Sequence, residues 1–132
     1  MTELFYRLLF CFVIGNSDMH LKNFSLIEED PGSRKFMLSP AYDLLPVNVI
    51  LPADKEQMAL TLNGRKRNIR KKDFLVLAQS YRINDKAAIR LMERVVKSKD
   101  LFIDMTRDSY LPSDYQDSLI NLIEDRCEVL NQ

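Results

Sequence analysis

Apolar positions recur along the chain with two different periods, and these periods predict its secondary structure. Residues 2–14 carry apolar side chains on more than one helical stripe, which predicts a helix buried on most sides. Gly15 follows directly, and glycine favours the backbone conformation in which helices end. We therefore expect the polar residues 16–23 to emerge from a rigid, buried support.

Two short alternating segments follow, at 24–28 and 35–38. Their period of two predicts β-strands, and the sequence Asp-Pro-Gly-Ser at 30–33 places proline and glycine where a type II turn needs them. The chain leaves an antiparallel hairpin at the same end at which it entered. We therefore expect it to carry Asp43 back toward Asn23.

Helical spacing dominates the second half of the chain. Apolar residues recur with this spacing over 74–81 and 88–96, and Asn84 is placed to cap the second of these helices. Residues 101–110 either extend that helix or form a turn of their own. These segments predict a pair of amphipathic helices.

Two further segments complete the expected architecture. Alternation over 58–62, just before an Asn-Gly pair, predicts another short strand. A last helix is expected from Ser113, with Gln116 completing a capping box and an apolar face that closes the core. The sequence thus predicts one compact α+β domain that is mainly helical, with a small β insertion.

Composition narrows the class of protein. The 132 residues suit one domain, and 46% hydrophobic with 29% charged residues is ordinary for a globular protein. No apolar run has the 18 residues of a membrane span, and the first residues do not read as a signal peptide, so we expect a cytoplasmic protein without membrane contact. Cys11 and Cys127 lack metal-ligand spacing and are expected to be buried, reduced thiols.

Charge is balanced overall but unevenly distributed. Residues 100–132 hold eight acidic side chains against Arg107 and Arg126, whereas residues 65–72 hold six basic ones. Such a basic run can bind a nucleic-acid backbone or an acidic protein, or it can form a solvated face. No aromatic residue interrupts it, so base stacking is disfavoured and the solvated face is preferred.

Candidate chemistry lies in the polar residues between these elements. Asp18, Asn23 five residues later and Asp43 beyond the hairpin follow the layout of a phosphotransferase. A carboxylate would orient the attacking hydroxyl and accept its proton, and oxygen ligands would hold Mg²⁺. His20 and Lys22 could donate to phosphate oxygens.

A structural explanation of the same residues remains open at this point. Asn16, Ser17 and Asp18 are residue types that cap turns, and His20 could be an ordinary core or surface histidine. Spacing alone does not decide between the two interpretations.

Three motifs in sequence order favour the phosphotransferase. The motifs are Gly-Asn-Ser-Asp-Met-His-Leu-Lys-Asn-Phe-Ser at 15–25, Leu-Ser-Pro-Ala-Tyr-Asp-Leu-Leu at 38–45 and Met-Ala-Leu-Thr-Leu-Asn-Gly at 58–64. Together they resemble the C-terminal lobe of the HipA family, and the similarity continues more loosely to about residue 99. HipA-like proteins are bacterial serine/threonine kinases that act as toxins of toxin–antitoxin modules.

The resemblance implies a role for each candidate residue. Asp18 matches the catalytic base, Asn23 the metal-binding asparagine and Asp43 the metal-binding aspartate that stands where other kinases have their DFG aspartate. His20 and Lys22 match positions that approach the phosphates. The implied cofactor is Mg²⁺ and the implied phosphate donor is ATP. The implied partner is a HipB-like helix-turn-helix antitoxin, which would make most DNA contacts, so that DNA is at most an indirect partner here.

The resemblance also divides the chain. It implies a partial kinase C-lobe over 1–132, and its parts are a catalytic loop at 15–24, the hairpin at 24–39, a metal-binding segment at 39–45 and a helical bundle at about 70–131. No His-Arg precedes Asp18, and Tyr-Asp-Leu-Leu replaces DFG.

A glycine-rich phosphate loop and the lysine of a nucleotide-binding strand are not recognised, so an N-lobe in cis or in trans is expected to hold ATP. The alternative is a truncated or degenerate kinase relic that serves as an interaction module for an antitoxin or a separate N-lobe.

Overall fold

The computed structural model describes all residues, 1–132, and is mainly helical with one small sheet, which confirms the α+β class. The helices are α1 (Thr2–Ile14), α2 (Val47–Ile50), α3 (Lys71–Ser80), α4 (Asp85–Lys97), α5 (Lys99–Arg107) and α6 (Ser113–Asn131). A short 3₁₀ turn, η1 (Leu21–Asn23), precedes strands β1 (Leu26–Glu28) and β2 (Phe36–Leu38).

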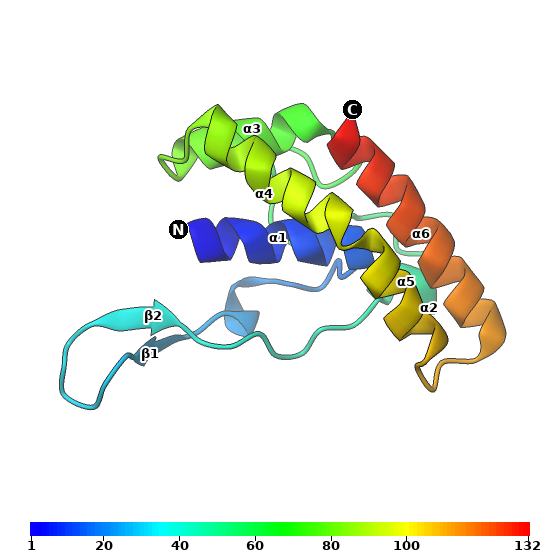
Figure 1. Cartoon of the computed structure of the whole chain (residues 1–132), viewed down its shortest axis with the longest axis horizontal. Helices are drawn as coiled ribbons and strands as arrows, with labels where there is room; N and C mark the ends of the chain where they lie inside the picture. The colour runs from blue at the N-terminus through cyan, green and yellow to red at the C-terminus, as the bar shows by residue number, and fades with distance from the viewer.

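Helix α1 lies at the centre of the helical body, where α4 and α6 pack against it (Figure 1). Its buried faces meet aromatic and aliphatic side chains of the other helices, as their sequence pattern predicts. Phe74 of α3 packs edge-to-face on Phe5 and Phe12, with ring centroids 6.4 and 5.1 Å apart. This core holds the C-terminal end of α1, and hence the start of the polar loop, in place.

The predicted helix ends are confirmed at two positions. Gly15 ends α1 with φ 73°, and Asn84 caps α4 by accepting a hydrogen bond from the Ala87 backbone N–H at 2.8 Å. Residues 99–107 form a separate helix, α5, which decides between the two possibilities left open by the sequence. Helix α2 lies in a proline-containing passage, and the sequence pattern there did not predict a helix.

Two local predictions are wrong. Residues 58–62 form no strand, and Leu62 makes only an isolated bridge with Arg65. The alternation there reflects the burial of Met58 and Leu62 under the helices, which does not require a partner strand. At the start of α6, Ser113 forms no capping bond; the Gln116 side chain instead donates to the Leu111 carbonyl at 3.0 Å.

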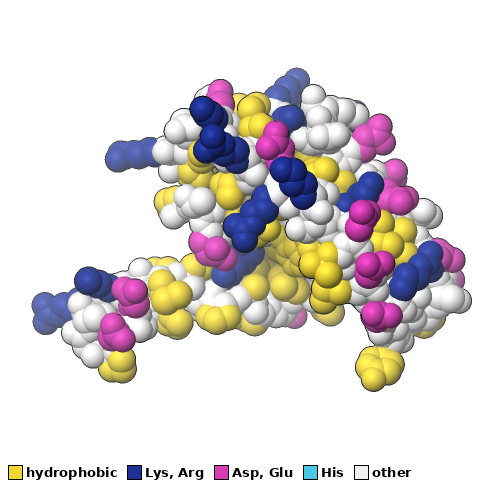
Figure 2. All heavy atoms as spheres, viewed as in Figure 1, with side chains coloured by type: hydrophobic (Ala, Val, Ile, Leu, Met, Phe, Trp, Pro, Cys, Tyr) yellow, Lys and Arg dark blue, Asp and Glu magenta, His cyan; other side chains and the backbone are white.

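The predicted hairpin is present and projects from the helical body (Figure 1). Its register pairs Leu26 with Leu38, and Gly32 adopts φ 79° in the expected turn. The strands contact chiefly each other. Leu26 and Phe36 are therefore exposed, and Figure 2 shows apolar side chains along this projection.

Side-chain burial agrees with two further expectations. Cys11 and Cys127 are free and buried, and burial raises their pKa to about 12 and about 11. In the basic run 65–72 only Ile69 is buried, as a solvated face requires. None of the helices combines the length and apolar character needed to cross a membrane.

Candidate active site

The polar loop after α1 exposes one carboxylate between buried neighbours. Asn16, Ser17 and Met19 are buried, whereas the Asp18 side chain is 68% exposed. The Asn16 side-chain oxygen accepts from the Asp18 backbone N–H at 3.3 Å, and the Asn16 N–H donates to the Cys11 carbonyl at 2.9 Å. Asn16 thus forms the turn that the structural interpretation predicted, and this turn directs Asp18 outward.

A second turn joins Asp18 to Asn23. The Asn23 side chain is buried and its Nδ2 donates to the Asp18 carbonyl at 2.9 Å, which closes the loop across η1. Its Oδ1 accepts no hydrogen bond and is free for a cation. His20 Nε2 lies 3.7 Å from Asp18 Oδ1, and Lys22 is exposed. The loop therefore gathers four of the five predicted residues.

The fifth residue, Asp43, returns to this loop through its neighbour. Tyr42 donates its hydroxyl to the Lys22 carbonyl at 3.1 Å, and these two residues directly precede Asp43 and Asn23. Asp43 itself is exposed and adopts φ 53°, a left-handed conformation that non-glycine residues rarely take. No hydrogen bond or ion pair joins its carboxylate to the loop.

Hydrogen bonds fix the base of the hairpin to α1, and they explain why the chain returns to the loop before Asp43. Arg7 Nη2 donates to the Ser39 carbonyl at 2.7 Å, and the hydroxyl of Ser25 donates to that of Ser39 at 2.7 Å. The Ser39 backbone N–H also donates to the Ser25 carbonyl at 2.8 Å. Both ends of the hairpin are therefore held at the same place.

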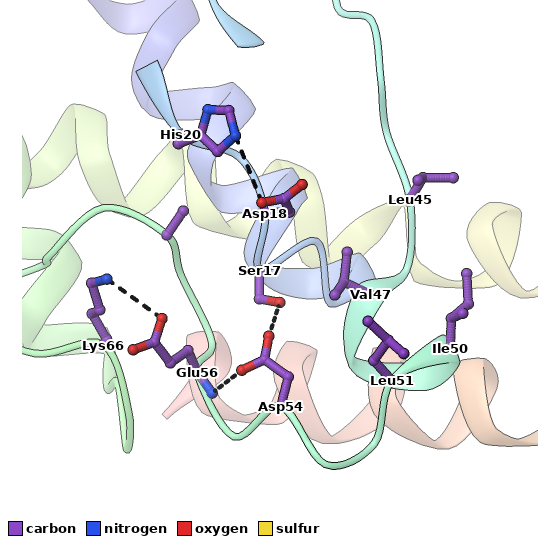
Figure 3. Close-up of a pocket in the computed structure, with 11 residues that line it drawn as sticks. Ser17, Asp18, His20, Leu45, Val47, Ile50, Leu51, Asp54, Glu56 and Lys66 are labelled. Carbon is purple, nitrogen blue, oxygen red and sulfur yellow. Dashed lines mark hydrogen bonds and ion pairs between the residues drawn. The ribbon is translucent and has the colours of Figure 1, made fainter. Parts of the chain in front are cut away.

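A cavity of about 630 Å³ opens beside Asp18 (Figure 3). One side is apolar, and its residues are Leu45, Val47, Ile50 and Leu51. The opposite side carries Asp54, Glu56 and Lys66. Ser17 donates its hydroxyl to Asp54 Oδ2 at 2.7 Å, and this bond, followed by one from the Glu56 backbone N–H, lowers the pKa of Asp54.

Helix α6 supports this arrangement from behind. Arg126 Nη1 donates to the Phe12 carbonyl at 3.3 Å, and Nη2 donates to Asn48 Oδ1 at 3.4 Å. Asn48 in turn donates to the Glu56 carbonyl at 2.8 Å. Burial lowers the pKa of Arg126 to about 10, so it remains charged at neutral pH. A cation at the C-terminal end of α1 also complements the helix dipole.

Sequence reasoning missed the supporting residues Ser17, Asn48 and Asp54. Ser17 and Asp54 are 37 residues apart, and no periodicity or spacing links a loop after a helix to an irregular passage between prolines. The only available signal was the presence of polar residues in that passage.

The donor set is compatible with a divalent cation that is completed by substrate. No three His, Cys, Asp or Glu side chains lie close enough to form a metal site by themselves. Mg²⁺ is commonly bound by one or two protein oxygens together with phosphates and water. The free Asn23 Oδ1 and the unpaired Asp43 carboxylate match that pattern.

Comparison with known proteins gives a consistent result. The sequence model for the HipA-like C-terminal domain matches residues 1–101. A protein of Haemophilus influenzae named "Putative kinase" is 25% identical over 98% of this chain and 42% of its own length. A protein of Sinorhizobium fredii named "Putative kinase Y4dM" is 35% identical over 73% of this chain and 23% of its own length.

The chain therefore spans less than half the length of these two curated relatives. The family match covers the loop, the hairpin, the Asp43 segment and the helices up to the start of α5, and it therefore includes all five candidate residues. On this match the chain belongs to the HipA-like C-terminal domain family.

Proposed function

We propose that this chain is the catalytic C-lobe portion of a HipA-like serine/threonine kinase, which transfers the γ-phosphate of ATP to a protein hydroxyl. The observation that carries the proposal is the closed turn in which buried Asn23 holds the Asp18 carbonyl while the Asp18 carboxylate faces solvent. A base must be accessible to the hydroxyl whose proton it accepts, and a metal ligand must be rigidly placed.

Asp18 has the role of the base in this proposal. Its carboxylate is exposed, and His20 Nε2 lies 3.7 Å away, so a substrate hydroxyl can approach it from the solvent side. Lys22 is exposed and the His20 side chain is 43% accessible on the same loop, and both would donate to phosphate oxygens. A lysine acts there as a positive charge, and a histidine donates through a ring N–H.

Asn23 and Asp43 would hold Mg²⁺. The bond between Tyr42 and the Lys22 carbonyl supports this pairing because it joins the residues that precede the two ligands. Bound Mg²⁺ would neutralise charge on the transferring phosphoryl group. The left-handed backbone of Asp43 is the kind of local strain that is found at ligand-binding positions.

The remaining parts of the proposed kinase lie outside this chain. An N-lobe, in cis or in trans, would supply the adenine and phosphate contacts, and a HipB-like helix-turn-helix antitoxin would be the regulatory partner. These proposals rest on family membership and on the fraction of the relatives' length that the chain covers.

Phosphate transfer in a reconstituted enzyme tests the proposal. The chain is combined with the N-lobe of a HipA-like kinase, and ATP-dependent incorporation of labelled phosphate into protein is measured with and without Mg²⁺. Asp18→Asn is expected to lower the rate by about 10²- to 10⁴-fold, because general-base catalysis is lost. Asp43→Asn is expected to raise the Mg²⁺ concentration needed for half-maximal rate.

Asp30→Asn is the matched control, because Asp30 is an exposed aspartate at the hairpin tip whose carboxylate makes no hydrogen bond. A full rate in the Asp18→Asn enzyme would show that Asp18 is not the base. The interaction-module alternative predicts binding of the N-lobe or antitoxin with no Mg²⁺-dependent transfer at all.

A further inference from the structure

We propose that the cavity beside Asp18 is the site for the acceptor segment of the substrate protein. We infer that it selects a segment with an apolar side chain next to the phosphorylated hydroxyl and an acidic side chain further along. The assignment of the hydroxyl rests on the proposed function, whereas the binding preferences rest on the cavity itself. Asp18 lines this cavity of about 630 Å³ and is the only one of the predicted base and metal ligands to do so.

The apolar side of the cavity is exposed although it is built from large aliphatic residues. Leu45, Ile50 and Leu51 have 51%, 41% and 59% of their surface accessible, and Val47 continues the same side. Val47 and Ile50 lie in α2, and Leu45 and Leu51 lie just before and just after it, which brings the four side chains to one side of the cavity (Figure 3). Contiguous exposed apolar residues at the edge of a candidate site are typical of a binding surface.

The acidic residues on the opposite side are already paired within the chain. Asp54 accepts from the Ser17 hydroxyl at 2.7 Å and from the Glu56 N–H at 3.0 Å, and the Glu56 carboxylate lies 3.4 Å from Lys66 Nζ. These carboxylates therefore do not require a cation from the occupant. An apolar side chain can enter between the two sides without displacing the hydrogen bonds of Asp54 or the Glu56–Lys66 ion pair.

Free positive charge lies immediately beyond this pair. Residues 64–67, which we call the basic turn, border a second hollow of about 530 Å³ that has no apolar lining. Glu56 and Lys66 line both hollows, so the two are adjacent. Arg65 and Arg67 are exposed and form no ion pair. Charge complementarity therefore favours an acidic side chain of the occupant at the basic turn.

These features favour a protein segment over a nucleic acid. A nucleic acid would use the arginines but would gain little from the aliphatic side, and no Phe, Tyr or Trp side chain lines either hollow for base stacking. A protein segment uses Asp18, the apolar side and the basic turn together. We therefore assign the surface to an acceptor peptide with a hydroxyl, an apolar and an acidic residue.

Peptide binding to the unmodified chain tests the assignment without any catalytic step. The probe is a fluorescein-labelled peptide with serine followed by leucine, two glycines and two glutamates, and its dissociation constant is measured by fluorescence anisotropy. Replacing its leucine by serine is expected to weaken binding about tenfold, because one aliphatic side chain is no longer buried. Replacing its glutamates by glutamines is expected to abolish the salt dependence of binding, because the peptide no longer carries charge at the basic turn.

Variants of the chain locate the binding site. Leu51→Glu is expected to weaken binding about tenfold or more, since it removes an apolar contact and places a carboxylate near the acidic peptide. The matched control is Leu101→Glu on α5, because Leu101 is 57% exposed and lies outside both hollows. Arg65→Glu with Arg67→Glu tests the basic turn, and Lys86→Glu with Arg90→Glu on the exposed face of α4 is its control.

Loss of binding in the cavity variants with retention in both controls supports the assignment. The assignment is overturned if the peptide does not bind, or if Leu51→Glu and Leu101→Glu bind it equally well. It is also overturned if a single-stranded DNA oligonucleotide binds in the cavity more tightly than the peptide. Selective peptide binding without phosphate transfer in the reconstituted enzyme would refute the kinase while leaving this docking surface intact. A rate of phosphate transfer that is unchanged by Leu51→Glu would refute the docking surface while leaving the kinase proposal intact.

Discussion

Gly15 connects the buried helix α1 to the candidate loop, and two independent constraints act on it. Its φ of 73° is unfavourable for a residue with a Cβ atom. A Cβ built there would also lie 2.8 Å from Leu122 Cδ2 and 3.3 Å from the Cβ of Asn48. Asn16 begins the loop directly after it, so any shift of Gly15 moves the turn that presents Asp18.

Gly15→Ala is therefore expected to destabilise the chain by about 2–4 kcal/mol, from backbone strain together with a clash in the core. The matched control is Gly32→Ala at the hairpin tip, where φ is 79° but no atom lies within 4 Å of the added Cβ. Strain alone should cost the control about 1 kcal/mol. Urea unfolding of both variants measures the difference, and equal losses would show that the clash at Leu122 is relieved.

At the residue scale the sequence predicted local turns better than distant contacts. The helix-ending role of Gly15 followed from residue type, and Asp18 and Asn23 are five residues apart, a spacing that one short turn can close. Ser17 and Asp54 could not be found in this way. Their hydrogen bond depends on how α2 folds back against the end of α1, and local spacing carries no information about that contact.

Helix α3 shows how a single carboxylate defines the start of an element. Asp73 is fully buried, and burial raises its pKa. Hydrogen bonds from the Asn63 side chain at 2.8 Å and the Arg70 backbone N–H at 2.8 Å act in the opposite direction. Together with nearby Arg65 and Lys72 they outweigh burial, and the net pKa of Asp73 is lowered.

A lowered pKa in the folded state fixes the sign of the pH dependence. The ionised Asp73 stabilises the fold above its unfolded pKa of about 3.9, and this contribution is lost as the pH falls through the folded value. Asp73→Asn is expected to lower the free energy of unfolding at pH 7 by about 1–2 kcal/mol, with a smaller effect in acid. Denaturation at pH 7 and in acid checks this, with exposed Asp100→Asn as the control. If Asp73→Asn lost the same stability at pH 7 and in acid, the ionised form of Asp73 would be excluded as the stabilising one.

Most elements with a strong period were predicted correctly, and residues 58–62 are the exception. The helices α1, α3 and α4 follow regular apolar spacing, and the hairpin follows alternation around a Pro-Gly turn. Residues 58–62 alternate equally well but form no strand, because an unpaired segment can bury alternate side chains under helices. Periodicity reports burial, and a strand additionally needs a neighbouring strand.

Over the whole molecule, Arg126 joins parts that are far apart in sequence. It contacts the Phe12 carbonyl across 114 residues and Asn48 across 78, and its guanidinium lies 4.5 Å from the centre of the Phe12 ring. Asn48 extends these contacts to the carbonyl of Glu56. The last helix thereby fixes both the end of α1 and the wall of the cavity, which no local pattern could have predicted.

Arg126→Met should lower the free energy of unfolding by about 1–3 kcal/mol, because it preserves volume but leaves two acceptors without their donors. Arg107→Met is the comparison, since the Arg107–Asp117 ion pair is exposed and such pairs contribute about 0–1 kcal/mol. Thermal and urea unfolding measure both. Similar stability of the two variants would show that water replaces the guanidinium at Phe12 and Asn48.

The bonds that fix Ser39 to Arg7 and Ser25 have a consequence for how the chain can change over evolution. They hold the two ends of the hairpin, so the distance between Asn23 and Asp43 is set below the strands and does not depend on the turn. Lengthening a surface loop costs little, about 0.6 kcal/mol for each doubling. The tip at residues 30–34 can therefore accept insertions, deletions or a whole inserted domain while the spacing of Asn23 and Asp43 stays unchanged.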